Sequence, residues 1–250
     1  MSRSTAETLL RLEREAWVLQ EPGGQVRWAL DGAAPAAALE RLQPAGGLRG
    51  RRLRVRLADA WLRYLVVRWP QGVRSAAERA AFLAHRFAEV HGIASPDWVL
   101  AADRDAHDLP ALACAAPAPV VAAAQGFAVR HGCVLDGISG EFITAYNTLR
   151  RRFDEADGAQ AALALLRDGR LTVGMWAGGA WAGVRSQAVR DDGAAALRLM
   201  LEAWMRDAAP DVPPTAQGAA HAQPGGVVYA AGFAGELPAA WRRVDLGPAT

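Results

Sequence analysis

Acidic and imidazole side chains gather in one short stretch of the chain, at Asp103, Asp105, His107 and Asp108. Carboxylate oxygens and imidazole nitrogens are common ligands of divalent cations, so these residue types would suit a metal loop. The stretch lacks the central glycine turn and the closing glutamate of a calcium-binding loop. We therefore expect a solvated connection between two strands here, and no metal site.

The nucleophilic side chains form no catalytic set. Ser186 lies outside any Gly-x-Ser-x-Gly turn. His85 and His131 have apolar neighbours on predicted helices, which favours packed or surface positions over general-base catalysis. Cys114 and Cys133 each stand in an apolar stretch, with neither a disulfide framework nor metal-ligand spacing. We expect no catalytic residue and a reducing, cytoplasmic compartment.

Composition and charge limit the partners. The 250 residues carry a formal net charge of +2, too little for a general attraction to nucleic acid, which we exclude as a partner. Arginines within 49–56 alternate with Leu53, Val55 and Leu57, as on a strand with one solvated face. No apolar run approaches the roughly 20 residues that span a bilayer, and residues 2–15 lack the apolar core of a signal peptide. We therefore expect no direct membrane insertion.

The chain divides into two halves with a similar order of elements. Hydrophobic residues make up 52% of it and charged residues 22%, which is enough apolar material for two packed lobes. The predicted division is an N-terminal helix, hairpin and connector over 1–50, a first lobe over 51–140 and a second lobe over 141–250.

In the first half, predicted strands alternate with helices. The expected elements are a helix over 5–15, a hairpin over 17–30 with its turn at 22–24, a helix over 33–42, two strands between 51 and 67, a helix over 75–91, strands over 98–102 and 109–115, a helix over 119–132 and a strand over 133–138. The helix over 75–91 has the strongest local signals, because Ser75 stands three residues before Glu78 and Gly92 follows the apolar pattern.

The second half repeats the rhythm. The expected elements are a helix over 141–153, strands over 161–166, 171–176 and 180–189, a helix over 194–208, a proline-rich loop over 210–224 and a last strand over 227–230. Asp168-Gly169 and Gly178-Gly179 are hairpin-turn dipeptides, so the three strands form a meander. Trp176 and Trp181 flank the second turn, and we expect them to pack across the strands rather than to present an aromatic surface.

Three stretches of the chain resemble the actin-like ATPase superfamily. Residues 57–63, with Asp59, resemble its first hairpin and aspartate; residues 109–138 resemble a strand, a helix and a glycine turn; residues 228–238 resemble the late strand and turn beside the adenosine. They are most similar to the PilM family of type IV pilus assembly and to the cytoplasmic part of the GspL family of type II secretion. The resemblance implies an α/β (α+β) fold of two ribonuclease H-like lobes with mixed sheets, in an actin-like architecture.

The resemblance also implies a nucleotide site. Its residues would be Asp59, Gly178, Gly179, Gly232 and Gly235. An actin-like ATPase needs glycines beside its aspartate, so that backbone N–H groups approach phosphate, and carboxylates that hold magnesium. Here Ala60 and Trp61 follow the aspartate, and no acid adjoins the glycines at 178–179. We therefore expect no cofactor; ATP with magnesium is the alternative.

The leading functional hypothesis is a non-catalytic, cytoplasmic scaffold that binds an inner-membrane component of a pilus or secretion apparatus. In the pilus relative, a short extended tail of a membrane partner occupies a groove, which by resemblance would lie near 75–138 here. The alternative is an ATP-binding ATPase of the same machinery, with weak activity. A ribonuclease H-like domain of unrelated role is a third class, but the strands carry no cluster of acids that a nuclease needs. The sequence leaves the partner, the apparatus and the oligomeric state open.

Overall fold

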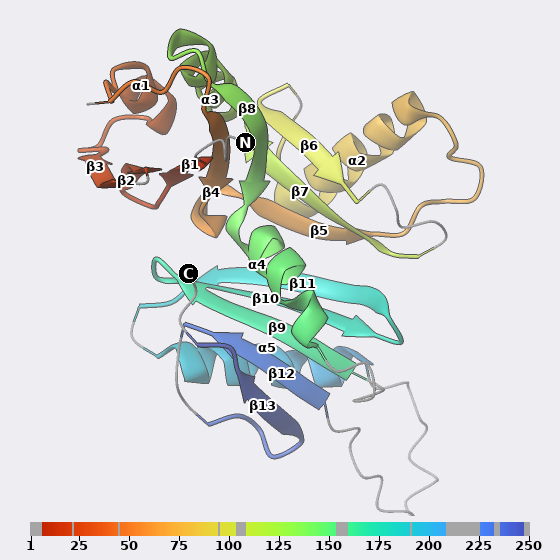
Figure 1. Ribbon diagram of the computed structural model, residues 1–250. Coiled ribbons are helices and arrows are strands. Elements are labelled where there is room, and N and C mark those ends of the chain that lie inside the picture. Colours follow the sequence, from red (N-terminus) through yellow and green to blue (C-terminus); the bar gives the residue numbers. More distant parts are fainter. Residues whose placement is uncertain are drawn as a thin grey trace, which may run out of the picture.

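The computed structural model contains two lobes, each built on a five-stranded mixed sheet (Figure 1). It describes residues 7–21, 23–44, 46–94, 96–103, 109–153, 160–190, 192–208, 226–232 and 236–247. The first sheet has the order β3 (Gly24–Ala29), β2 (Ala16–Glu21), β1 (Glu7–Leu12), β4 (Arg52–Leu57) and β8 (Val134–Gly140). The second has the order β11 (Ala180–Ala188), β10 (Arg170–Ala177), β9 (Gln160–Arg167), β12 (Gly226–Ala231) and β13 (Trp241–Asp245).

The two sheets have the same topology. Each begins as an antiparallel meander of three strands, and two further strands join it in parallel. Parallel neighbours need a crossover connection, and a helix lies in the crossover between β1 and β4 and in that between β9 and β12. The predicted pair of ribonuclease H-like lobes with mixed sheets is confirmed.

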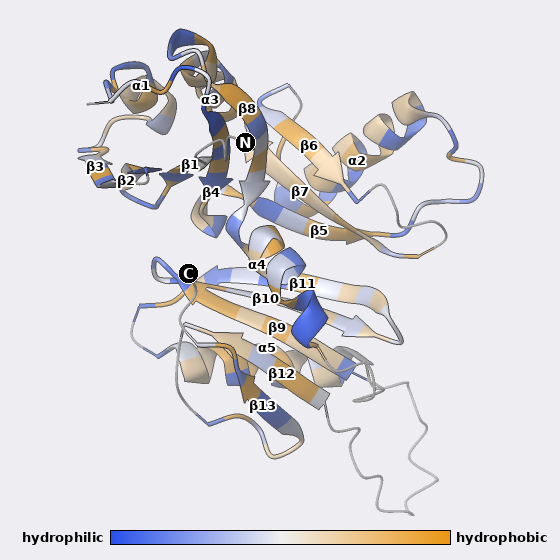
Figure 2. Ribbon diagram, in the orientation of Figure 1, coloured by the Kyte–Doolittle hydropathy of each residue, from blue (hydrophilic) through white to orange (hydrophobic). Residues whose placement is uncertain are grey.

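The helices cover the sheets unequally. α1 (Pro35–Glu40) and α3 (Ala118–Arg130) pack on one face of the first sheet. α4 (Glu141–Leu149) and α5 (Gly193–Ala208) lie on opposite faces of the second sheet (Figure 1). In Figure 2, β9 is largely apolar and β4 largely hydrophilic. This agrees with helices on both faces of the second sheet and on one face of the first. In the described part of the chain, no helix combines the length and hydropathy needed to cross a membrane.

A third, smaller sheet is inserted into the first lobe between β4 and α3. It is antiparallel, in the order β5 (Arg63–Val67), β7 (Ala111–Pro117) and β6 (Trp98–Ala102). α2 (Ala76–His91) packs on it through Leu83 and Phe87. Ser75 accepts a hydrogen bond from the backbone of Glu78 at 3.1 Å, and the Glu78 carboxylate accepts one from the Ser75 N–H at 2.9 Å. This capping box, with Gly92 at φ 64°, confirms the predicted start and end of the helix.

The predicted helix over 5–15 is wrong, because residues 7–12 form β1. Thr8, Leu10 and Leu12 are all buried, which is the two-residue period of a strand with one face in the core. β1 pairs with β2 on one side and β4 on the other, so it is the central strand of the first sheet. The pairing of β1 with these two strands outweighs the helix propensity of its leucine and glutamate residues.

The stretch 57–63 is not a hairpin, which corrects the assignment made from the resemblance. β4 and β5 belong to different sheets, and the 3-10 helix η1 (Asp59–Trp61) joins them. The first hairpin of the chain is β1–β2. The strand β13 was not expected, because Trp241-Arg-Arg-Val-Asp is short and mostly polar. The predicted loop over 210–224, most of the acidic stretch 103–108, and Gly235 lie outside the described residues.

One hydrophobic core runs through both lobes. It joins Leu10 and Leu53 of the first sheet to Phe142 of α4 and to Leu163 and Tyr229 of the second sheet. The Phe142 side chain is fully buried where the lobes meet. The lobes are therefore packed against each other through apolar side chains, and the polar groups described below lie around this contact.

Candidate functional site

Asp59 lies in η1, at the contact between the lobes. Its Oδ1 accepts hydrogen bonds from the Tyr64 hydroxyl at 2.6 Å and from the Phe142 N–H at 3.1 Å. Phe142 is the second residue of α4, so the carboxylate satisfies an amide that the helix leaves unpaired. Burial raises the pKa of Asp59, and hydrogen bonds from Tyr64, Phe142 and Thr172 oppose that rise. Asp59 therefore links the first lobe to α4 and to β10.

The predicted glycines lie at two different ends of the second sheet. Gly178 and Gly179 form the β10–β11 turn, where Ala177 pairs with Gln160. Gly232 follows β12, whose Ala231 pairs with Leu165. Five residues of strand separate these two ends, about 17 Å at ~3.3 Å per residue. The structure therefore does not bring Gly178 and Gly179 together with Gly232.

Each of these glycines has a local structural reason. Gly178 and Gly179 have φ of 57° and 76°, as a two-residue turn between antiparallel strands requires. Gly232 has φ 89°, and a Cβ there would collide with the carbonyl oxygen of Leu166. Asp59 and Gly232 lie toward the same end of the second sheet, since Thr172, a partner of Asp59, pairs with Leu165.

The turns that face each other between the lobes are those of β1–β2 and β9–β10. The first is closed by a hydrogen bond from the Glu13 N–H to Ala16 O at 2.8 Å, and the second is Asp168-Gly169. Arg14 reaches from the first to the second, because its Nη1 would lie 3.7 Å from a Cβ on Gly169. Sequence reasoning missed this pair of turns, since it depended on recognising β1 as a strand.

An ion pair lies beside these turns. Glu141, the first residue of α4, accepts from Arg167 Nε at 2.9 Å, and the two side chains are only 8% and 19% exposed. Burial raises the pKa of Glu141 to about 7; Arg167 opposes the rise, and the carboxylates of Asp59 and Asp168 add to it. Burial also lowers the pKa of the neighbouring Arg56. The chain's own charged side chains thus occupy the space beside the two turns.

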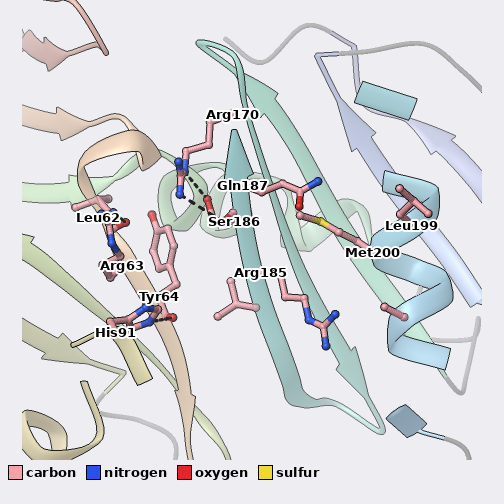
Figure 3. Close-up of a pocket in the computed structure, with 12 residues that line it drawn as sticks. Leu62, Arg63, Tyr64, His91, Arg170, Arg185, Ser186, Gln187, Leu199 and Met200 are labelled. Carbon is pink, nitrogen blue, oxygen red and sulfur yellow. Dashed lines mark hydrogen bonds between the residues drawn. The ribbon is translucent and has the colours of Figure 1, made fainter. Parts of the chain in front are cut away.

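A pocket of about 650 Å³ opens next to Asp59, between the edge strands β5 and β11 (Figure 3). The first lobe contributes residues 62–64 and His91, and the second contributes Arg170, residues 184–187 and one side of α5. Arg170 donates from Nε to Ser186 Oγ at 2.8 Å, and Ser186 Oγ also bonds Thr172 Oγ1 at 2.9 Å. The pocket wall is therefore connected to Asp59 through Thr172.

The pocket residues were not predicted. The β10–β11 register places Thr172 opposite Ser186, which the Gly178-Gly179 turn signal could have suggested. The approach of β5 to β11 joins two different sheets, and no sequence pattern indicates it.

The other residues considered in the sequence analysis are the metal-ligating types, the two cysteines and the tryptophan pair. In the described residues no three metal-ligating side chains cluster. Cys114 and Cys133 are free thiols, and burial raises the pKa of Cys114 to about 12. Trp176 and Trp181 pack edge to face at 5.8 Å within an aromatic group that includes Tyr146, which confirms cross-strand packing.

No protein-family model and no curated protein matches the chain. Solved structures do. A Bacteroides thetaiotaomicron protein with an actin-like ATPase fold and unknown function aligns at TM-score 0.57 and 9% identity, over 92% of this chain and 83% of that one. The cytoplasmic domain of EpsL, an inner-membrane component of the Vibrio cholerae type II secretion system, aligns at TM-score 0.54 and 15% identity, over 98% and 91%.

The type IV pilus biogenesis complex PilM–PilN aligns at TM-score 0.57 and 13% identity, over 92% of this chain and 82% of that one. These likenesses extend over both lobes, and they agree with the duplicated strand order. The resemblance inferred from the sequence is confirmed at the level of the fold. The chain has the actin-like ATPase fold.

Proposed function

We propose that this chain is a non-catalytic actin-like scaffold that binds a cytoplasmic segment of an inner-membrane protein in a type IV pilus or type II secretion apparatus. The observation that carries the proposal is the packing between the lobes, where charged side chains occupy the space beside the two facing turns. The structural likeness to the EpsL cytoplasmic domain and to PilM in complex with PilN supports the choice of apparatus.

The residues at the facing turns do not fit ATP with magnesium. A phosphate site needs backbone N–H groups that a glycine leaves accessible, and it excludes unpaired acids. The first turn carries Glu15, whose carboxylate would repel phosphate, and Glu13, whose carboxylate is paired with Arg11 and Arg27. Gly169 of the second turn is approached by Arg14, and Asp59 is buried against Tyr64 and Phe142. None of these groups is arranged to hold a metal-bound nucleotide.

The proposed partner surface is the pair of free strand edges beside α3. β8 ends the first sheet and β6 ends the inserted sheet, and α3 contacts both strands (Figure 1). Each edge carries an exposed valine, Val134 at 58% and Val99 at 44%. An extended peptide can add to such an edge through its main-chain hydrogen bonds, with adjacent apolar side chains contributing specificity.

Nucleotide binding tests the non-catalytic part of the proposal. In calorimetry with ATP and magnesium, we expect no binding in the micromolar range. Micromolar affinity that requires magnesium would contradict the scaffold and support the ATPase alternative, with Asp59, Gly178, Gly179, Gly232 and Gly235 as the residues to test first.

Partner binding tests the surface. Cytoplasmic segments of the inner-membrane pilus and secretion proteins from the same organism are immobilised, and binding of the purified chain is measured by interferometry. We expect one segment to bind, and Val99→Asp or Val134→Asp to raise its Kd about tenfold, because a charge replaces an apolar contact. Val26→Asp is the matched control, since Val26 is 40% exposed on β3 at the opposite edge of the first sheet. An equal effect of all three variants would refute the assignment of the surface.

A further inference from the structure

The pocket between the lobes has a cationic wall. Arg63 and His91 belong to the first lobe, and Arg170 and Arg185 to the second. In Figure 3, Arg63 lies to the left of Tyr64 and Arg170 above it, whereas Arg185 projects from the other side of β11, toward Met200. No aspartate or glutamate is among the described residues that line the pocket. The wall therefore combines arginines from both lobes without an acid between them.

The nearest buried carboxylate neutralises this wall only in part. Asp59 is only 6% exposed, and its Oδ1 already accepts from Tyr64 and Phe142. Burial lowers the pKa of Arg170, and repulsion from Arg63 lowers it further, although the charge of Asp59 partly opposes both effects. Positive charges on the two lobes thus repel each other across the pocket.

Arg170 and Arg63 are held in place while keeping donors for a ligand. Arg170 donates from Nε to the Ser186 hydroxyl at 2.8 Å and from one terminal nitrogen to the Ser186 carbonyl at 3.4 Å. These two bonds leave the second terminal nitrogen of the guanidinium for a ligand. Arg63 donates to Leu62 O at 2.8 Å and its guanidinium lies 5.7 Å from the Trp98 ring centroid. A guanidinium fixed in this way loses little freedom when it binds an oxyanion.

Apolar side chains also line the pocket. Leu62 lies beside Arg63, and Leu199 and Met200 of α5 lie on the other side of β11 (Figure 3); Leu199 is 60% exposed. The volume of about 650 Å³ is in the range of small-molecule sites. An occupant would therefore match the pocket if it had an anionic group for the arginines and a hydrocarbon body for the apolar side chains.

We propose that this pocket binds a small organic anion, with a phosphate or a pair of carboxylates beside an apolar body, and that the bound anion holds the two lobes together. Phosphate is tetrahedral and carboxylate is planar, but each presents a pair of oxygens that a guanidinium group can bind in a bidentate manner. An anion between Arg63 and Arg170 replaces their repulsion by two attractions. The site goes beyond the proposed scaffold role and does not depend on it.

The test uses two anions with the same aromatic body. Phenyl phosphate and phthalate are each titrated into the full chain by calorimetry without magnesium, with neutral benzamide as the reference. We expect one of the two anions to bind with a submillimolar Kd and benzamide not to bind. Binding of phenyl phosphate assigns the natural ligand to phosphate esters, and binding of phthalate assigns it to dicarboxylates.

Variants locate the binding. Arg63→Gln and Arg170→Gln should each raise the Kd about tenfold, because each removes one charge-assisted contact. Arg198→Gln is the matched control: it removes an exposed arginine of α5 that is paired with Glu202 outside the pocket, and it should change the Kd less than about twofold. The bound anion should also raise the melting temperature of the wild type, and not that of Arg63→Gln.

Two results would overturn the proposal. One is that neither anion binds better than benzamide. The other is that Arg198→Gln weakens binding as much as Arg63→Gln, which would indicate general attraction to a basic surface. The melting temperature of each unliganded variant shows whether it is folded, and Arg63→Gln keeps the test valid if Arg170→Gln does not fold, because Arg63 is outside the Ser186 and Thr172 network.

Discussion

β4 and β12 occupy the same place in their two sheets and differ completely in side chains. Each pairs in parallel with the first strand of its meander, and Leu9 and Leu163 stand five residues before the first turn of each. The matched residues are Arg52 with Val227, Arg54 with Tyr229, and Arg56 with Ala231. One sheet thus presents a row of arginines where the other presents apolar side chains.

The difference follows from what covers each sheet. α4 packs on this face of the second sheet and α5 on the other, so every residue of β12 is buried. On the first sheet, the side chains of Arg52 and Arg54 are 55% and 57% exposed and bind the same carboxylate, Asp136. Two strands with one topology therefore have different hydropathy patterns, because the pattern reports the layers that cover a strand and not its connections.

The largest expected effect comes from truncating the matched positions. Tyr229→Ala should lower the free energy of unfolding by about 3–5 kcal/mol, because it leaves a cavity under α4 where the side chain is 2% exposed. Arg54→Ala should change it by less than about 1 kcal/mol, since Arg54 is exposed and Asp136 keeps Arg52. Urea unfolding measures both. Equal losses would show that the two faces are covered alike.

Asp59 tests the connection between the lobes. Asp59→Ala leaves the Tyr64 hydroxyl and the Phe142 N–H buried without their acceptor, so we expect a loss of about 2–4 kcal/mol in unfolding free energy. Asp59→Asn keeps an acceptor oxygen and should lose less than half as much. If both variants lose the same amount, the charge of the carboxylate rather than its hydrogen bonds stabilises the contact.

Glu141 gives a smaller effect that depends on pH. Its pKa is about 7 in the folded chain and near 4.5 when unfolded, so the folded state binds the proton more tightly. Its contribution to stability is therefore full below about pH 4.5 and is lost as the pH rises through 7, on the order of 2–3 kcal/mol in total. Urea unfolding at pH 5 and pH 8 should show a smaller decrease for Glu141→Gln than for the wild type. An equal decrease in both would mean that Glu141 does not titrate in this range.

The elements with local signals could be predicted from the sequence. α2 has its own capping residues at Ser75 and Gly92, and Asp168-Gly169 sets the turn of its hairpin. β1 could not, because the leucines at 9, 10 and 12 fit a helix face as well as a strand. Its pairing with β2 and with β4, which is more than 40 residues away, decides between the two.

The site was harder to predict from the sequence than the fold. Asp59 lies at the contact between the lobes as its resemblance to a family aspartate suggests, but its surroundings depend on Phe142, which is 83 residues away in the chain. The pocket arginines lie on strands of two different sheets, and nothing in either stretch alone indicates that they meet. The expectation that Asp59 and the glycines bind no nucleotide stays a prediction, with ATP and magnesium as its alternative.

The apolar core that crosses from one lobe to the other limits how the molecule moves and melts. Lobes joined by small polar interfaces swing as rigid bodies about a hinge, whereas here a swing would bring the buried ring of Phe142 into water. Opening the molecule in this way costs nearly as much as unfolding part of it. The two halves should therefore melt together, as a single calorimetric transition, although each has its own sheet of the same topology.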